Sequence, residues 1–400
     1  MTTQTERLLA LLSEILPANR FQSARLGDLG KITSLADFLA RVPLTTKADL
    51  AADFAAHPPF GTNLTRPRVE YTRFCQTSGT TAQPLAILDT PESWEWMLGN
   101  WCRIYRESGV LPGERIYFAF AFGPFLGFWT AFEAAAKYRC LCIPGGGLSS
   151  AARLRGILQH RAEVLCCTPT YALHLAEVAA AEGLEICGSS VRRIIVAGEP
   201  GGSVVSVRQR ISAAWGGAEV LDHYGMTEVG PVAYQRTGEP GALHILEDSY
   251  FAEILHPHTL APVLDGELGE LILTPLGRTA WPLLRYRTGD LVRRRTAPGF
   301  VLDGGIIGRT DDMVVVRGVN IYPSAVDAVV RAMPEIVEYR VAITTRGEMP
   351  ELAVEIESHD PAAAAKLERA LTDAFTLRIP VAQVPSLPRY ELKARRWQRV

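Results

Sequence analysis

The sequence lacks a long apolar run and carries almost no net charge. No stretch approaches the roughly 20 apolar residues that a membrane-spanning helix needs, because Gly123, Pro124 and Gly127 interrupt the most apolar part, 116–132. The formal net charge of −2 favours neither nucleic acid nor an anionic membrane as a partner. Residues 1–20 are amphipathic and lack the apolar core of a signal peptide. We expect a soluble, cytoplasmic protein that binds neither nucleic acid nor membranes.

The cysteines lack the arrangement of a disulfide framework. They number seven, and an odd count in a cytoplasmic chain argues against such a framework. Cys140 and Cys142 alternate in one apolar run, Cys166 and Cys167 are adjacent in another, and neither pair has a histidine close by. We interpret them as small buried apolar side chains. A metal site built from the two pairs is the alternative.

Strand-like and helix-like apolar runs alternate between about residues 110 and 200, which predicts a parallel sheet covered by helices. In such folds ligands bind beyond the carboxyl ends of the strands. From 251 to 305, short strands and turns predict an antiparallel portion. The predicted fold class is therefore α/β. A large N-terminal domain (1–308) has parallel sheets, covering helices and a small antiparallel β portion, and a small, mobile α+β domain (309–400) follows it.

The loop at 77–84 (TSGTTAQP) collects hydroxyl groups and a glycine, which offer O–H and backbone N–H donors to a polyphosphate. It lacks the lysine of a Walker loop, so that class of nucleotide site is not indicated. Taken alone, such a cluster is more often a solvated turn.

Segment 222–228 (DHYGMTE) combines a ring that can stack on a purine, a hydroxyl that can reach a phosphate and a carboxylate that can hold Mg²⁺. Asp290, in 286–290 (YRTGD), is suited to accept hydrogen bonds from ribose hydroxyls. A further motif, 308–312, lies at the proposed domain boundary, and Lys393 lies in a basic stretch after it. Three of these have a plain alternative. Segment 222–228 is then a strand end with a buried tyrosine, 286–290 an ordinary turn, and Lys393 one cation of a solvated tail.

In this order the segments resemble the adenylate-forming superfamily of acyl-CoA synthetases, non-ribosomal peptide adenylation domains and luciferases. Within it the chain is similar to the phenylacetate–coenzyme A ligase family from about residue 35 to 395. The closer likeness rests on VPLTTKADL at 42–50, TSGTT at 77–81, CCTPTYALHLAEVA at 166–179, GEP at 198–200, YGMTE at 224–228, LHILEDSYFAEIL at 243–255, RYRTGDL at 285–291 and GRTDDMVVVRGVNIYPS at 308–324.

The resemblance implies a binding site for ATP. It implies that Tyr224 stacks on the adenine, that Thr227 contacts the α-phosphate, and that Asp290 and Arg309 hold the ribose. The implied ATP or AMP contacts are Thr77, Ser78, Gly79, Thr80, Thr81, Gly198, Glu199, Pro200, His223, Tyr224, Gly225, Met226, Thr227, Asp290 and Arg309.

The resemblance also implies the catalytic groups, which are Lys393, Thr227 and Glu228. Glu228 ligates Mg²⁺, and Lys393 bridges the carboxylate substrate and ATP during adenylation. Asp311 lies at the hinge, near 309–311, about which the small domain turns for the second half-reaction. Coenzyme A is the implied acceptor, and a homodimer is one oligomeric option.

Three departures from the family pattern bear on these roles. Ala82 replaces the glycine that usually closes the phosphate loop, and Leu392 stands where a glycine often precedes the catalytic lysine. Some relatives carry a structural zinc site with cysteines after the YGxxE motif. The corresponding segment here, 231–235 (PVAYQ), has none, so we predict no zinc.

The acid-binding pocket is expected in the aromatic segment 117–129, where Gly123 and Gly127 allow close approach, together with the PGGG loop at 144–147. About half of these aromatic residues are expected in the sheet core. An aromatic surface suits a planar aryl acid better than a long acyl chain. The predicted pocket residues are Phe122, Gly123, Phe125, Phe128, Gly146 and Tyr171.

The leading functional hypothesis is an aryl-acid–coenzyme A ligase. A second keeps the adenylation but transfers the acyl group to a carrier-protein thiol or an amine, in a specialised biosynthetic role. A third activates another oxyanion, such as nitrite for diazotisation. A fourth is a non-catalytic protein that binds an adenylate or an aryl acid, against which the presence of Glu228, Asp290, Arg309 and Lys393 argues.

Lys393→Ala should slow formation of the acyl-adenylate by roughly 10²–10³-fold, the effect of one lost transition-state donor. Pre-formed adenylate should still react with a thiol, because the lysine is needed only in the adenylating orientation. ATP–pyrophosphate exchange measures the first step. An unchanged exchange rate in the variant contradicts the assignment.

Overall fold

The computed structural model describes residues 3–16, 18–27, 32–77, 84–312, 314–316, 319–346, 349–389 and 396–400. Its N-terminal helices are α1 (Gln4–Ile15), α2 (Arg20–Leu26), α3 (Leu35–Arg41) and α4 (Lys47–Ala56). Each begins where a Ser, Thr or Asn side chain accepts a hydrogen bond from a backbone N–H of the first turn. The apolar face of α1, with Leu8, Leu12 and Ile15, packs against Leu276 and Leu284 of the antiparallel portion.

The alternating strand and helix pattern predicted for 110–200 is confirmed. Parallel neighbours β4, β3, β5, β6 and β7 form one side of an eight-stranded sheet, and β8, β9 and β13 extend it with antiparallel pairing. These strands are β3 (Arg115–Phe118), β4 (Leu141–Pro144), β5 (Val164–Cys167), β6 (Arg193–Val196), β7 (Glu219–Met226), β8 (Gly230–Tyr234), β9 (Ala242–Ile245) and β13 (Val301–Asp303).

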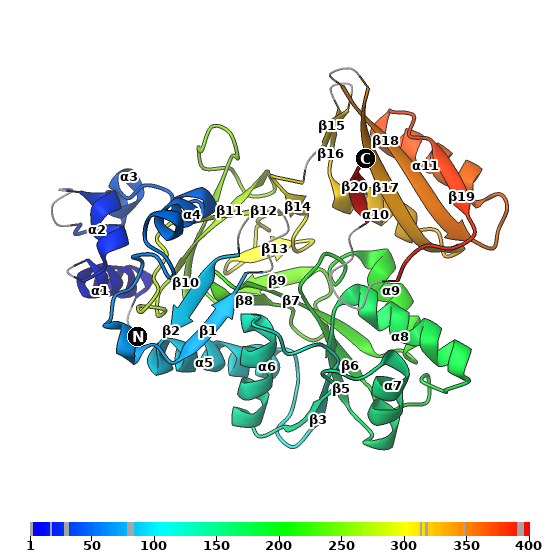
Figure 1. Cartoon of the computed structure of the whole chain (residues 1–400), viewed down its shortest axis with the longest axis horizontal. Coiled ribbons are helices and arrows are strands. Elements are labelled where there is room, and N and C mark those ends of the chain that lie inside the picture. The colour runs from blue at the N-terminus through cyan, green and yellow to red at the C-terminus, as the bar shows by residue number, and fades with distance from the viewer. Residues whose placement is uncertain are drawn as a thin grey trace.

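Helices cover both faces of this sheet, so its central strands β3, β5 and β6 are buried on two sides (Figure 1). Ile116 and Phe118 of β3 face one core, with α5 and α6, whereas Tyr117 between them faces a second core, with α7, α8 and α9. The covering helices are α5 (Pro91–Glu107), α6 (Leu126–Lys137), α7 (Ser150–Gln159), α8 (Pro169–Glu182) and α9 (Val205–Ala214).

A four-stranded antiparallel sheet has the order β10-β11-β12-β14, which confirms the antiparallel portion. Its strands are β10 (Tyr250–Leu255), β11 (Leu268–Pro275), β12 (Tyr286–Arg293) and β14 (Gly308–Arg309). Strand β13 comes from the same stretch of sequence but pairs with β9 in the larger sheet. A separate hairpin joins β1 (Arg73–Gln76) to β2 (Ala86–Asp89) after a short 3₁₀ helix (Arg68–Glu70).

The C-terminal part has an apolar core of its own, separate from the cores of the larger part. A mixed sheet with the order β19-β18-β17-β20 and two helices enclose this core, and the part forms a distinct lobe in Figure 1. Its elements are β15 (Val314–Val316), β16 (Val319–Ile321), α10 (Pro323–Arg331), β17 (Ile336–Arg346), β18 (Met349–Ser358), α11 (Ala363–Phe375), β19 (Val381–Val384) and β20 (Trp397–Arg399). The α/β fold class is thereby confirmed, whereas a domain boundary at 308/309 stays a prediction. No helix in the described part of the chain combines the length and the apolar character needed to cross a bilayer.

A buried ion pair ties the β1–β2 hairpin to the larger sheets. The Arg278 and Asp89 side chains are fully buried and form two parallel bonds, Nε to Oδ1 at 2.7 Å and Nη2 to Oδ2 at 2.5 Å. Arg278 Nη1 also donates to the carbonyl oxygens of Thr227 and Glu228, at 2.8 and 2.9 Å. One guanidinium therefore connects β2 with the loop that carries the predicted catalytic Thr227 and Glu228.

Asp89→Asn should lower the free energy of unfolding by about 3–5 kcal/mol, because it leaves the Arg278 charge buried without its counter-charge. Asp248→Asn is the control, since Asp248 is two-thirds exposed beside Arg103 and such pairs contribute less than about 1 kcal/mol. Urea unfolding compares the two variants. Equal losses would show that burial of the pair is unimportant.

Candidate active site

Several predicted site residues, far apart in the sequence, meet where β7 ends. The Tyr224 hydroxyl donates to Asp290 Oδ2 at 2.6 Å, and Arg309 Nη1 donates to Asp290 Oδ1 at 3.0 Å. Arg309 also forms two bonds with Asp311, at 2.8 and 3.1 Å. Strand pairing places Asp290 of β12 directly opposite Arg309 of β14. The structure thus joins residues that the sequence separates by up to 87 positions (311 − 224).

Gly289 makes this approach possible. Its φ of +77° lies in the left-handed region, and a Cβ at this position would lie 2.8 Å from Arg309 Nη2. Only glycine accepts both conditions without strain. The glycine of the RTGD motif is therefore explained by the contact between Asp290 and Arg309.

The charges in this network compensate one another. Burial raises the pKa of Asp290 above its usual value, although Arg309 and the Tyr224 hydroxyl oppose that rise. Burial lowers the pKa of Arg309, but Asp311 and Asp290 outweigh it and leave the net pKa raised. Tyr224 has a strongly raised pKa, because it is buried beside Asp290. Tyr224 therefore stays a neutral hydroxyl that donates to the carboxylate.

Glu228 is also buried, and its carboxylate contacts a lysine from the N-terminal helices. Its Oε1 lies 3.3 Å from Lys47 Nζ, and burial together with the nearby Glu228 carboxylate raises the pKa of Tyr286. Lys47 is half-exposed in the first turn of α4. Lys47 is not among the site residues predicted from the sequence, although it lies in VPLTTKADL, a motif of the family resemblance.

The Gly198, Glu199 and Pro200 loop follows β6, whose last residue pairs with Asp222 of β7. The loop therefore lies at the same edge of the sheet as the 224–228 motif. Glu199 Oε1 accepts a hydrogen bond from the backbone N–H of Thr170, in the first turn of α8, at 2.8 Å. This contact holds Glu199 against the N-terminus of α8, where a carboxylate is favoured.

The remaining residues of the β7 motif have different surroundings. His223 is buried against Trp101, with ring centroids 4.1 Å apart, and its Nδ1 lies 2.8 Å from the Ala233 carbonyl oxygen. Gly225 is exposed, and Met226 and Thr227 are half-buried. A nucleotide contact through the His223 side chain stays a prediction, because the described contacts of the ring belong to the core.

Only the two ends of the predicted phosphate-binding loop (77–84) belong to the described residues. Thr77 is buried, and its Oγ1 accepts from Leu85 N at 3.0 Å, so it closes the base of the β1–β2 hairpin. Ser78, Gly79, Thr80 and Thr81 lie outside the described residues, as do Ala82, Leu392 and Lys393. The Gln76 N–H donates to the Pro124 carbonyl oxygen at 2.6 Å, which places the hairpin beside the aromatic segment.

The aromatic segment forms a connected cluster. Phe122 lies 5.0–5.3 Å from the rings of Trp129, Phe132 and Phe120, and Phe120 stacks on Phe128 at 4.2 Å. Phe125 contacts Phe128 edge-on at 6.0 Å.

Glycines bring backbone close to these rings. A Cβ at Gly146, in the PGGG loop, would lie 3.0 Å from the Phe122 ring, and one at Gly123 would lie 2.9 Å from Phe125. The predicted pocket residues therefore lie together, with the exception of Tyr171. That side chain is fully buried in the second core, where its hydroxyl bonds Ser150 and Arg153.

Metal ligands are sparse in the described part of the chain, where no group of three or more His, Cys, Asp and Glu side chains is placed to hold an ion. A magnesium ion that binds with a nucleotide takes only one or two carboxylates, the rest being water and phosphate oxygens. Glu228 fits that requirement. His244, next to the segment where some relatives carry zinc, pairs with Glu239 at 2.7 Å.

Comparison with known families agrees with this geometry. The profile described as "AMP-binding enzyme" matches residues 69–275, and the profile "AMP-binding enzyme C-terminal domain" matches residues 318–398. The chain belongs to the AMP-binding enzyme family. The phenylacetate-coenzyme A ligase of Thermus thermophilus is 32% identical to this enzyme over 370 residues, which cover 90% of this chain and 81% of that protein. That of Escherichia coli is 32% identical over 329 residues, 80% of this chain and 72% of that protein. The predicted kinship with phenylacetate–coenzyme A ligases is confirmed.

A solved structure extends the likeness to three dimensions. The crystal structure of 2-hydroxyisobutyryl-CoA ligase in the postadenylation state, in complex with R3-HIB-AMP, is 30% identical and superposes with a TM-score of 0.92. The superposition covers 98% of this chain and 88% of that one. Against the same ligase in complex with 2-HIB-AMP and CoA in the thioesterification state, the TM-score is 0.74.

Stability of this AMP-binding enzyme should depend on pH through His223. Burial lowers the pKa of His223 to about 4, against about 6.5 in an unfolded chain. The stabilisation is therefore complete above about pH 6.5 and declines as the pH falls towards 4, by up to about 3 kcal/mol. Burial also raises the pKa of Asp222 to about 6, and protonation of this carboxyl increases stability as the pH falls. The effect of His223 is therefore isolated with a variant that changes His223 and keeps Asp222.

His223→Asn retains a donor for the Ala233 carbonyl and removes the titrating ring. The difference in free energy of unfolding between wild type and variant should shrink as the pH falls from 7 to 4. Urea unfolding at several pH values measures it. A difference that stays constant over that range is incompatible with the assignment.

Proposed function

We propose that this AMP-binding enzyme activates a carboxylic acid as its acyl-adenylate, with release of pyrophosphate, and then transfers the acyl group to coenzyme A. The observation that carries the proposal is the network of Tyr224, Asp290 and Arg309, with the buried carboxylate of Glu228 on the same motif as Tyr224. Its relatives include ligases named for an acid and coenzyme A, which supports the acceptor.

The chemistry of this reaction requires cations at the site. In the first half-reaction a substrate carboxylate oxygen attacks the α-phosphorus, and the bond to pyrophosphate breaks. Two anions must meet, so the protein contributes mainly through positioning and charge neutralisation. Glu228 is the carboxylate that would hold Mg²⁺ beside the phosphates. Lys47, which contacts Glu228, and Lys393 supply ammonium groups.

The Asp290 carboxylate keeps acceptor capacity for the ribose. Its two oxygens each accept one hydrogen bond from the protein, from Tyr224 and from Arg309. A carboxylate offers about four acceptor positions, so two ribose hydroxyls are accommodated. Arg309 offsets the cost of burying the charge and holds the carboxylate in place.

An aromatic acid is the substrate class that the Phe122 cluster supports. Phe122 is half-buried, with Gly146 against its ring, so the ring forms an apolar wall beside a loop without side chains. Burying an aryl ring there is favoured by about 25 cal/mol per Å² of apolar surface, with edge and stacking contacts added. A small hydroxy acid is the second candidate, because the TM-score of 0.92 is with a ligase named for 2-hydroxyisobutyrate.

Pyrophosphate release with a panel of acids should be fastest with benzoate, phenylacetate or cinnamate types and should require Mg²⁺. The panel includes octanoate, 2-hydroxyisobutyrate and nitrite, each with and without coenzyme A. Thioester formation in the presence of coenzyme A supports that acceptor over a carrier protein or an amine. Faster adenylation of octanoate or 2-hydroxyisobutyrate than of every aryl acid refutes the aromatic assignment.

Phe122→Leu should lower kcat/KM for the best aryl acid by about tenfold, the scale of one lost aromatic contact with its apolar area. The matched control is Phe74→Leu, which changes an exposed ring on β1. Equal effects of the two substitutions would place the substrate ring elsewhere.

A further inference from the structure

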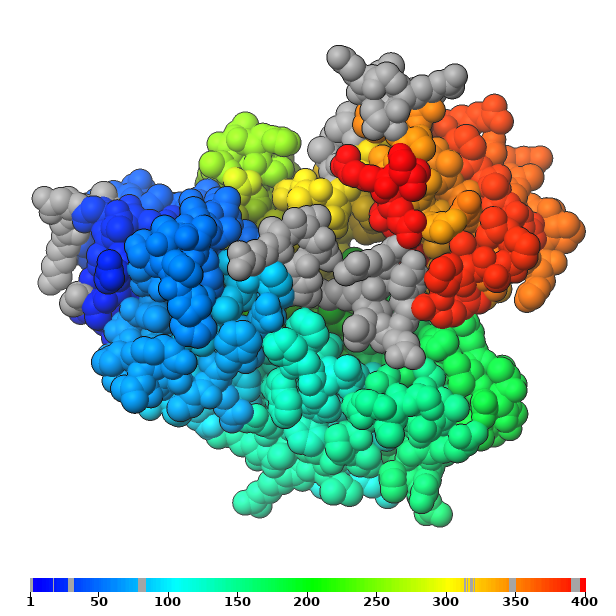
Figure 2. Space-filling view, in the orientation of Figure 1, coloured from blue at the N-terminus to red at the C-terminus, as the bar shows by residue number. Residues whose placement is uncertain are grey.

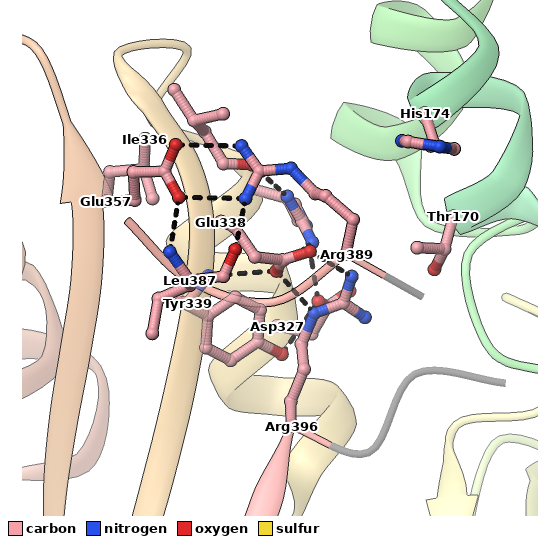
Figure 3. Close-up of polar contacts among 12 residues, drawn as sticks. Thr170, His174, Asp327, Ile336, Glu338, Tyr339, Glu357, Leu387, Arg389 and Arg396 are labelled. Atoms are coloured by element: carbon pink, nitrogen blue, oxygen red, sulfur yellow. Dashed lines mark hydrogen bonds and ion pairs between the residues drawn. The ribbon is translucent and has the colours of Figure 1, made fainter. Parts of the chain in front are cut away.

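Arg389 contacts both parts of the molecule. Its Nε lies 3.0 Å from Glu177 Oε2 on α8, and its two Nη atoms each lie 2.8 Å from the Glu357 carboxylate on β18. One side chain therefore connects the C-terminal lobe with a helix that covers the large sheet. Figure 2 shows this lobe against the green surface of the larger part, and Figure 3 shows Arg389 between Glu357 and the helix that carries Thr170 and His174.

The guanidinium is held rigidly on the C-terminal side. Arg389 Nη1 also donates to the Leu387 carbonyl oxygen at 2.8 Å, and the Leu387 N–H donates to Glu357 Oε2 at 2.7 Å. A bidentate pair fixes the plane of the guanidinium, as a lysine ammonium cannot. Because both Nη atoms bind Glu357, the Nε–H bond points in a fixed direction towards the larger, N-terminal part of the molecule (the large lobe). Glu177 of α8 accepts a hydrogen bond from it there.

Arg396 provides a second anchor on the C-terminal lobe. It forms two bonds with Glu338 of β17, at 2.7 and 3.1 Å, and Arg331 donates to the same carboxylate at 3.2 Å. Both guanidinium groups lie 5.3 Å from the centroid of the Tyr339 ring. The large lobe reaches this region as well, because Arg210 Nη2 of α9 donates to the Ile336 carbonyl oxygen at 3.4 Å.

The two anchors flank Lys393 in the sequence, four residues after Arg389 and three before Arg396. A chain advances at most about 3.6 Å per residue, so the spacing of a few residues limits how far a residue can lie from each anchor. The contact of Arg389 with Glu177 of α8 therefore limits the region that Lys393 can reach. A change at Glu177 acts on that region without altering the substrate-binding residues.

The contact is suited to repeated formation and release. The interface encloses a cavity of about 20 Å³ lined largely by charged side chains, including Arg210, Glu177, Glu338, Arg389 and Arg396. Polar inter-domain contacts of this kind contribute little net affinity, and domains joined by them move readily. Burial raises the pKa of Glu177, but the neighbouring His174 and Arg389 outweigh it and leave the net pKa lowered. The pair is therefore charged at neutral pH.

The arrangement of the whole chain is nearer to one state of a solved relative than to two others. The TM-score is 0.92 with 2-hydroxyisobutyryl-CoA ligase after adenylation, and 0.74 both with its open conformation and with its thioesterification state. The Arg389–Glu177 contact thus occurs in an arrangement similar to that of the relative after adenylation, and different from that of its thioesterification state.

We propose that Arg389 is a positioning residue for adenylation, and that its ion pair with Glu177 holds the C-terminal lobe on α8 in the orientation that presents Lys393 to ATP. The inference rests on the proposed function. The ion pair is made in the first half-reaction and released for the second. It acts on the relative population of the two orientations and leaves the affinity for ATP and acid unchanged.

The test uses Glu177→Gln, with Glu182→Gln as the matched control. Both glutamates lie on α8 with 38% exposed side chains, but Glu182 pairs with Arg155 of α7, within the large lobe. E177Q should lower kcat for ATP–pyrophosphate exchange about three- to tenfold, with KM for ATP and acid unchanged. Conversion of pre-formed acyl-adenylate and coenzyme A to thioester should be as fast as in the wild type or faster. E182Q should match the wild type in both steps.

Added salt should slow exchange in the wild type more than in E177Q, because salt screens the partly exposed pair. Equal slowing of both half-reactions in E177Q would indicate structural damage and overturn the inference. So would identical behaviour of E177Q and E182Q.

A second measurement does not depend on turnover. Fluorescent amino acids at the exposed positions Glu185 and Asp373 report the distance between the lobes. The distance distribution should broaden in E177Q and not in E182Q, whether or not any acid is activated. Absence of pyrophosphate exchange in the wild type with every acid tested refutes the proposed function. An unchanged distance distribution in E177Q instead refutes the proposed role of the Arg389–Glu177 ion pair.

Discussion

The buried pair of Arg278 and Asp89 is the constraint on which the site depends. Two fully buried charges satisfy each other, and the remaining guanidinium nitrogen holds the carbonyls of Thr227 and Glu228. The loop that carries the predicted catalytic residues is thereby attached to the hairpin that leads into the phosphate loop. A backbone carbonyl in a buried position needs a donor. Arg278 supplies two such bonds from one atom, so the loop has little freedom to shift.

The site manages charge by pairing its groups before a nucleotide enters. Asp290 accepts from Tyr224 and Arg309, and Glu228 contacts Lys47. An unpaired carboxylate buried in these positions would be protonated or would destabilise the fold. With partners in place, each carboxylate is held in a fixed orientation. Preorganised groups of this kind need not rearrange when charge develops on the α-phosphate.

Contacts between the two lobes differ in kind from the apolar contacts that stabilise each lobe. Each lobe has its own apolar core. Around Arg389 and Glu177, the described polar contacts between the lobes are ion pairs and hydrogen bonds beside a small cavity. Exposed and partly exposed charge pairs of this kind hold two parts together more weakly than an apolar interface does.

The sequence by itself determined the fold class and the alternation of parallel strands and covering helices along the chain, because alternating apolar runs have few alternative packings. It also determined the family, since motifs such as YGMTE and RYRTGDL occur in a fixed order. Only the tertiary structure decided which of those residues touch: the pairing of β12 with β14 brings Asp290 to Arg309, and the packing of α4 brings Lys47 to Glu228. It also separated Tyr171 from Phe122, and it joined Arg389 to Glu177 across 212 positions. Such contacts depend on how whole elements pack, and a local pattern of residues carries no information about that packing.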